Sequence, residues 1–137
     1  MKHHSFPIRV YYEDTDAGGI VYHASYLKFA ERARTEWLRS LGFEQQLMMD
    51  EQDVAFVVRH LDIEFLRSAR LDDVLTIDSS LHDITRATIT MNQTVRRGAE
   101  ILCQLCVKLA AVCPSNGRLS RIPPPVLDAL NRHKHKE

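Results

Sequence analysis

A single long amphipathic helix interrupts a series of strands, and this order constrains the fold more than any other feature of the chain. Apolar residues recur at helical spacing from Tyr22 to Leu41, and Gly42 follows as a natural C-cap. Before this helix, residues Phe6 to Tyr12 alternate between apolar and polar, the period of a strand with one buried face. The alternation predicts that Tyr12 points inward.

Strand patterns return after the helix and continue for most of the remaining chain. They cover Val54 to Leu66, Val74 to Leu81, Thr85 to Arg96 and Glu100 to Cys113. Apolar residues on both faces of the last of these indicate a central strand that is covered on both sides. A short helix that begins at the prolines 123–125 ends the pattern. This order predicts an α+β domain with one long helix packed on an antiparallel five-stranded sheet.

Size and charge exclude several classes of protein. The 137 residues suit one domain spanning 1–137, and 18 basic residues balance 18 acidic ones. This balance argues against a nucleic-acid partner. The first twenty residues contain no apolar leader, and no stretch reaches the roughly 18 apolar residues of a transmembrane segment, so we expect a cytoplasmic protein.

The three cysteines include a C-x-x-C pair, Cys103 and Cys106. On a strand, a spacing of three turns the two sulfurs to opposite faces, which does not suit a redox pair. A zinc site needs further ligands, which Cys113 alone does not supply. We therefore expect reduced cysteines that belong to the core.

The segment with candidate catalytic residues lies between the first strand and the helix. It combines Asp16, the glycines 18 and 19, and His23. A helix N-terminus offers unpaired N–H groups and a positive dipole end, which suit a thioester carbonyl oxygen on which negative charge develops. Asp16 could attack the carbonyl carbon or deprotonate a water molecule, while His23 orients one of them.

Structural interpretations compete with this hypothesis. An acidic residue before a helix is usually a cap, paired glycines are usually a turn, and a lone histidine at a helix start is more often structural. A calcium loop starting at Asp14 fails on spacing, because Gly18 falls at the fifth position and Ser25 falls where a bidentate glutamate belongs. We therefore predict no metal site.

The same segment resembles the signature of the 4-hydroxybenzoyl-CoA thioesterase-like hot-dog family, and most closely its Tol-Pal-associated acyl-CoA thioesterase branch. The matching residues are Tyr12-Glu-Asp-Thr-Asp16, the glycine loop, Val21-Tyr-His23, Tyr26 and Glu31-Arg-Ala-Arg34, with Val54 to Arg59 and Ala69 to Asp73 downstream. One departure is Ser68, where the branch often has proline. The resemblance covers nearly the whole chain and implies the hot-dog fold, a curved antiparallel sheet wrapped around a long central helix.

The resemblance also implies hydrolysis of an acyl thioester to a free acid and a thiol, with Asp16 as nucleophile or general base. His23 and Tyr12 are the implied supporting catalytic residues. Our candidates for the substrate-binding loop and for the backbone N–H groups that polarise the carbonyl are Gly18, Gly19, Val21, Tyr22 and His23. Asp14 is assigned to the loop scaffold, and Glu31 to a structural position on the helix.

The implied partners are acyl-CoA or acyl-carrier protein as substrate, and further copies of the chain in a homodimer or homotetramer joined at sheet edges. No cofactor is implied beyond the CoA of the substrate. A role in phospholipid metabolism or the cell envelope with the Tol-Pal system is expected from the branch. Two alternatives stay open: a hot-dog hydratase or dehydratase, and a non-catalytic module that binds acyl-CoA or acyl-carrier protein.

Overall fold

The computed structural model describes residues 3–134, which form one five-stranded antiparallel sheet and three α-helices. The strands are β1 (His4–Arg9), β2 (Ala55–Phe65), β3 (Val74–Ile84), β4 (Thr88–Arg97) and β5 (Glu100–Val112). Their order across the sheet is β1-β3-β4-β5-β2, and every neighbouring pair is antiparallel.

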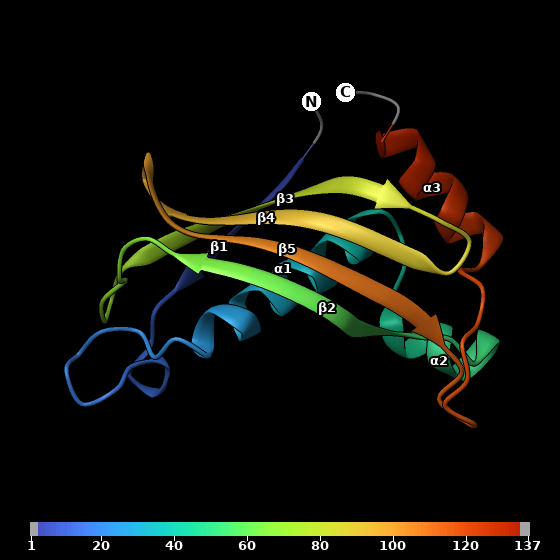
Figure 1. The fold of residues 1–137 in the computed structure, drawn as a ribbon, viewed down its shortest axis with the longest axis horizontal. Coiled ribbons are helices and arrows are strands. Elements are labelled where there is room, and N and C mark those ends of the chain that lie inside the picture. Colours follow the sequence, from blue (N-terminus) through green and yellow to red (C-terminus); the bar gives the residue numbers. More distant parts are fainter. Residues whose placement is uncertain (1–2, 135–137) are drawn as a thin grey trace.

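Helix α1 (Ser25–Ser40) lies along the inner face of the curved sheet (Figure 1). It buries Tyr26, Phe29, Ala33 and Trp37 at spacings of three and four residues, the periodicity of an amphipathic helix. The loop before α1 lies at one end of the sheet, and α2 (Gln45–Gln52) and α3 (Pro124–Lys134) lie at the other (Figure 1). The predicted α+β hot-dog architecture is confirmed.

The two edges of the sheet differ. Strand β1 is short, with six residues, and contains Pro7, whereas β2 has eleven residues and no proline. Val57 and Val58 on β2 are 44% and 49% exposed. Strand β2 therefore leaves the longer edge with free backbone groups, and this edge carries the exposed apolar pair Val57 and Val58.

Strand β5 lies between β4 and β2, inside the sheet as predicted. Both faces are buried only at its ends, at Leu102 and Cys103 and again at Ala110 and Ala111. In between, Gln104 is exposed while Leu105 is buried. The prediction that both faces are covered thus holds for the ends of β5 but not for its middle.

Three local predictions need correction. Strand β1 ends at Arg9, and Tyr12 begins a 3-10 turn over Tyr12–Asp14, where its side chain is 82% exposed instead of pointing inward. Helix α1 begins at Ser25, three residues after Tyr22. Helix α2 was not predicted, because only Met48 of its eight residues is buried and it carries no clear apolar stripe.

The cysteines are free thiols. Cys103 is fully buried, and burial raises the pKa of its thiol to about 12. Cys106 and Cys113 are half-buried, so only Cys103 is the core cysteine that the sequence predicts for all three. Within residues 3–134, no helix is long and apolar enough to cross a membrane.

Candidate active site

The loop that carries Asp16 is a small hairpin held by backbone hydrogen bonds. Thr15 pairs with Val21 across it, and the Asp16 N–H donates to the Ile20 carbonyl at 3.0 Å. The outer strand of the hairpin then bonds to the turn after β2, through the Val21 N–H to the Ala69 carbonyl at 2.9 Å. The position of Asp16 is therefore fixed by backbone contacts to a distant part of the chain.

Asp14 anchors the base of this hairpin, as predicted for a scaffold residue. Its carboxylate is buried and accepts the Tyr11 N–H at 2.9 Å. Its carbonyl accepts the Tyr22 N–H at 2.9 Å and the Ser25 hydroxyl at 3.0 Å. Asp14 thus joins the 3-10 turn, the hairpin and the first residue of α1.

The structure brings Asp16 and His23 to one open pocket of about 290 Å³ at the N-terminal end of α1. The other residues that line it are Ile20, Val21, Tyr26, Phe65, Leu66, Arg67 and Ser68. The Asp16 side chain is exposed and accepts the Gly18 N–H at 3.0 Å. Of the predicted site residues, Tyr12, Gly18, Gly19 and Tyr22 do not line this pocket.

The predicted oxyanion donors also need correction. The Val21 N–H donates to the Ala69 carbonyl, and the Tyr22 N–H donates to the Asp14 carbonyl, so neither is available to a substrate. The N–H groups of His23 and Ala24 have no acceptor among residues 3–134. These two amides, at the positive end of the α1 dipole, are the donors that the structure offers to a carbonyl oxygen.

Tyr26 is a pocket residue that the sequence analysis did not assign to the site. Its hydroxyl oxygen accepts the Ala69 N–H at 2.9 Å, which ties α1 to the turn after β2. Burial raises the pKa of the Tyr26 hydroxyl, against a smaller opposing effect of the Ala69 hydrogen bond, so it stays protonated. The sequence feature that could have assigned Tyr26 to the site is its position on the apolar stripe of α1, three residues after His23.

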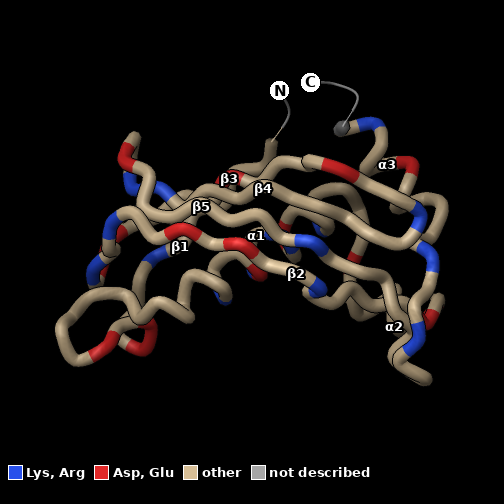
Figure 2. Tube along the Cα trace, viewed as in Figure 1, with Lys and Arg blue, Asp and Glu red and all other residues tan. Residues whose placement is uncertain are grey.

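The loop that carries Asp16 is acidic. The loop of residues 10–24 carries Glu13, Asp14 and Asp16 but no lysine or arginine (Figure 2). Arg67 lines the pocket from the opposite side and pairs with Glu100 at 3.2 Å. In the described part of the chain, no group of three or more His, Cys, Asp or Glu side chains is placed to hold a metal ion.

Comparison with known proteins agrees with this geometry. The sequence profile of the thioesterase superfamily matches residues 18–104, from the glycine loop through most of the sheet. The chain belongs to the thioesterase superfamily. The predicted family is thereby confirmed, and the pocket of this thioesterase lies at the start of the matched region, where Asp16 precedes it and His23 lies within it.

Relatives support the acyl-CoA thioesterase branch that the sequence predicted. It is 52% identical over 108 residues, 79% of each chain, to the acyl-CoA thioesterase YbgC of Haemophilus influenzae. It is also 52% identical over 90 residues, 66% of each chain, to the acyl-CoA thioester hydrolase YbgC of an Escherichia coli strain. A solved structure described as a probable thioesterase from Bartonella henselae is 38% identical, with a TM-score of 0.85 over 89% of this chain and 100% of that one.

Proposed function

We propose that this thioesterase hydrolyses acyl-CoA, with water as acceptor and a free acid and CoA as products. The observation that carries the proposal is the shared pocket of Asp16 and His23 beside two unpaired amides at the N-terminus of α1. The YbgC relatives, whose names specify acyl-CoA thioester hydrolysis, support the same substrate class.

The proposed reaction uses three groups in one place. The thioester carbonyl oxygen accepts hydrogen bonds from the His23 and Ala24 amides, which stabilise the negative charge of the tetrahedral intermediate. Asp16 acts on the carbonyl carbon in one of two ways: its carboxylate attacks directly, or it takes a proton from the water that attacks. Collapse of the intermediate breaks the C–S bond, and the thiolate of CoA leaves and takes up a proton. After direct attack, water hydrolyses the mixed anhydride on Asp16 to release the free acid; in the other route, the proton that Asp16 took from water is returned to the thiolate.

Tyr12 keeps only an indirect place in this proposal. Its side chain is 82% exposed and lies outside the pocket. Its carbonyl accepts the Thr15 hydroxyl at 2.7 Å, so its backbone helps to shape the hairpin. Within one chain, Tyr12 therefore supports the fold of the loop and does not contact the reacting atoms.

We propose a homodimer formed through β2. Its unpaired edge is the longer of the two sheet edges and exposes Val57 and Val58, and pairing it with a second copy removes that exposed edge. Three further expectations follow from the family resemblance and stay predictions. They are assembly into a tetramer, acyl-carrier protein as a second carrier, and a role with the Tol-Pal system in envelope phospholipid metabolism. The cytoplasmic location, expected from the sequence, and the lack of a cofactor also stay predictions.

The test is thiol release from a panel of short-chain, long-chain and aromatic acyl-CoAs, measured with a thiol-reactive dye. Asp16→Asn keeps the size of the side chain and removes its charge. We expect it to lower kcat by about a hundredfold or more. The matched control is Glu13→Gln, an exposed carboxylate three residues away, which should retain full activity.

Full activity in Asp16→Asn would contradict the assignment of Asp16 while leaving thioester hydrolysis intact. Absence of thiol release from every acyl-CoA would contradict CoA as the carrier. Acyl-carrier-protein thioesters are the next substrates to test in that case, and intact thioesters there would favour the binding-module alternative.

A further inference from the structure

The turn that joins β2 to β3, residues 66–73, forms one wall of the Asp16 pocket. Leu66, Arg67 and Ser68 line the pocket from this turn. In Figure 1, the turn lies at the same end of the sheet as the loop before α1 and as the turn between β4 and β5. Any movement of the turn after β2 therefore changes the shape of the pocket.

The same turn carries the hydrogen bonds that hold two other residues of the pocket. The Ala69 carbonyl accepts the Val21 N–H at 2.9 Å, and the Ala69 N–H donates to the Tyr26 hydroxyl at 2.9 Å. Val21 belongs to the Asp16 hairpin, and Tyr26 belongs to α1. The hairpin and the helix are thus positioned relative to each other through this turn.

Arg97, on β4, holds the turn without lining the pocket. Its Nη1 donates to the Asp73 carboxylate at 2.7 Å and to the Ser68 carbonyl at 3.4 Å, at two separate points of the turn. Its Nη2 donates to the Glu100 carboxylate at 2.7 Å, and Glu100 pairs with Arg67 at 3.2 Å. Because a guanidinium presents its donors in a rigid planar fork, these contacts fix the position of the turn against β4.

Asp73 transmits this contact to the rest of the turn. Its carboxylate also accepts the Arg70 N–H at 2.8 Å, and its carbonyl accepts the Val10 N–H at 2.9 Å. The side chain of Arg97 and the backbone of the turn therefore meet at one carboxylate. Strand β5 separates β4 from the β2 edge, so these contacts are built within one chain and do not need the proposed dimer.

Arg96, the neighbour of Arg97, holds a different part of the molecule. The side chains of Arg96 and Arg97 are 34% and 33% exposed, and each binds an aspartate, Asp78 at 2.6 Å and Asp73 at 2.7 Å. Within residues 3–134, the hydrogen bonds of Arg96 go to Asp78 on β3 and to the Gly98 carbonyl, and none reaches the turn after β2. Two adjacent arginines of equal exposure therefore differ in what they hold.

We propose that Arg97 is a positioning residue for thioester hydrolysis, because it holds the turn that sets the Asp16 hairpin against the N-terminal end of α1. This inference rests on the proposed function. The guanidinium acts on the turn through Asp73, and the turn acts on the hairpin and the helix through Ala69. A displacement of about 1 Å in a reacting group is enough to lower a rate by roughly a hundredfold.

The kinetic test compares Arg97→Met with Arg96→Met, which removes an ion pair of the same kind and exposure. Thiol release from the best acyl-CoA of the panel is measured under conditions in which the wild type and both variants are folded. We expect Arg97→Met to lower kcat by about tenfold and to change KM by less than about twofold, because reacting groups are displaced. Arg96→Met should keep the kcat of the wild type.

Two further variants separate positioning from a general loss of stability. Arg97→Lys keeps the charge beside Asp73 but lacks the planar fork, so its kcat should lie between those of Arg97→Met and the wild type. The double variant Asp73→Asn with Arg97→Met should lose little more kcat than Arg97→Met alone. Full additivity of the two losses would contradict action through Asp73.

Hydrogen exchange gives a readout that does not depend on activity. The Val21 and Ala69 amides donate to the two hydrogen bonds that the turn carries, and both should exchange faster in Arg97→Met than in Arg96→Met. The amide of Val107, in the middle of β5, is the reference for global unfolding and should exchange equally in both variants. Where Arg97→Met does not fold, Arg97→Lys and Arg96→Lys provide the same comparison.

The outcomes distinguish this inference from the proposed function. Thiol release by the wild type together with equal kcat values in Arg97→Met and Arg96→Met overturns the inference and leaves the hydrolysis intact. Absence of thiol release from the wild type contradicts the hydrolysis itself. The exchange rates then still decide whether Arg97 holds the pocket, and equal rates at Val21 and Ala69 in the two variants overturn that as well.

Discussion

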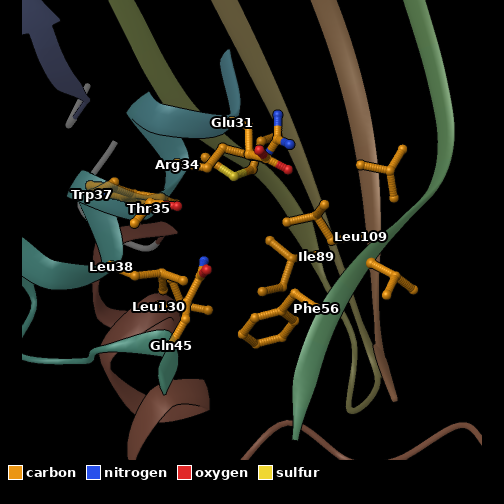
Figure 3. A pocket seen from close by; sticks show the side chains of 13 residues that line it. Glu31, Arg34, Thr35, Trp37, Leu38, Gln45, Phe56, Ile89, Leu109 and Leu130 are labelled. Carbon is orange, nitrogen blue, oxygen red and sulfur yellow. The ribbon is translucent and has the colours of Figure 1, made fainter. Parts of the chain in front are cut away.

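At its N-terminal end, helix α1 follows a loop with an exposed carboxylate, whereas its second half carries a buried guanidinium. Asp16 is reached from solvent and is positioned by a backbone hairpin, while Arg34 is enclosed and is positioned by the side chain of Gln93. The exposed site has free amides but few packed side chains around the reacting group. Around Arg34 the packed side chains are mostly apolar, among them Trp37, Leu38 and Ile89 (Figure 3).

This difference separates two tasks of a small domain. The reaction proposed for Asp16 needs water, and its position on a surface hairpin leaves the carboxylate exposed to solvent. An enclosed cation such as Arg34 gains most from a fixed polar partner, here Gln93, because electrostatic interactions are stronger in a place without water. One helix joins both sites, so substitutions can probe each end separately.

The largest effect is expected from His23→Ala. His23 is exposed and lines the Asp16 pocket, so its loss should lower kcat/KM by about a hundredfold while the melting temperature stays unchanged. Steady-state kinetics with the best acyl-CoA of the panel provides the measurement. The control is His82→Ala, because His82 is an exposed histidine on β3. An equal loss of kcat/KM in both variants would contradict the assignment of His23 to the site.

Tyr26→Phe should reduce the stability of the N-terminal end. It removes the acceptor of the buried Ala69 N–H, and an unsatisfied buried donor costs about 1–3 kcal/mol. Urea unfolding measures the change in the free energy of unfolding. The exposed Tyr22→Phe should change it by less than about 0.5 kcal/mol. Equal values for the two variants would show that Tyr26 does not hold the turn.

The glycines of the hairpin form a matched pair. Gly19 has a φ of 77°, in the left-handed region, so Gly19→Ala should cost roughly 1 kcal/mol. A Cβ at Gly18 meets only Asp16 Oδ1 at 3.5 Å, an ordinary contact, and Gly18→Ala should be close to neutral. Thermal unfolding of both variants distinguishes them, and a larger loss for Gly18→Ala would contradict the described hairpin.

A smaller effect on the free energy of unfolding is expected when the pH is lowered. Burial of Asp73 disfavours its charge, but the Arg70 N–H at 2.8 Å and Arg97 outweigh this and hold the pKa of the carboxyl below its ordinary 3.8. The stabilisation is therefore complete above about pH 4 and is lost as the pH falls through the lowered pKa. Urea unfolding between pH 6 and pH 3 should show a shallower decline for Asp73→Asn than for the wild type. Parallel declines would contradict this assignment.

The sequence predicted the fold well because long periodic segments leave few alternatives. The helix up to Gly42 and the four strands after it follow from spacing alone, and Gly42 has the expected positive φ of 96°. Helix α2 was missed because Leu47 is half-exposed, so its apolar residues mark no buried face. Periodicity is informative only where a face is buried.

The site was predicted less completely, and the reasons are local. The predicted strand was extended to Tyr12 in error. The chain turns there because the Asp14 side chain accepts the Tyr11 N–H, and this hydrogen bond cannot be seen in the alternation of apolar and polar residues. The Val21 amide was misassigned because its partner, Ala69, is far away in sequence. The burial of Arg34 could have been predicted, since it falls four residues after Ala30 and three before Trp37, on the buried face of α1.

The backbone attachment of the Asp16 hairpin has a practical consequence for engineering. The hairpin is held by main-chain bonds of Asp16, Gly19 and Val21, which any side chain at positions 17 and 20 leaves intact. Ala17 is exposed, and Ile20 lines the pocket. These two positions form a replaceable rim, at which libraries can reshape the pocket while the Asp16 carboxylate keeps its coordinates.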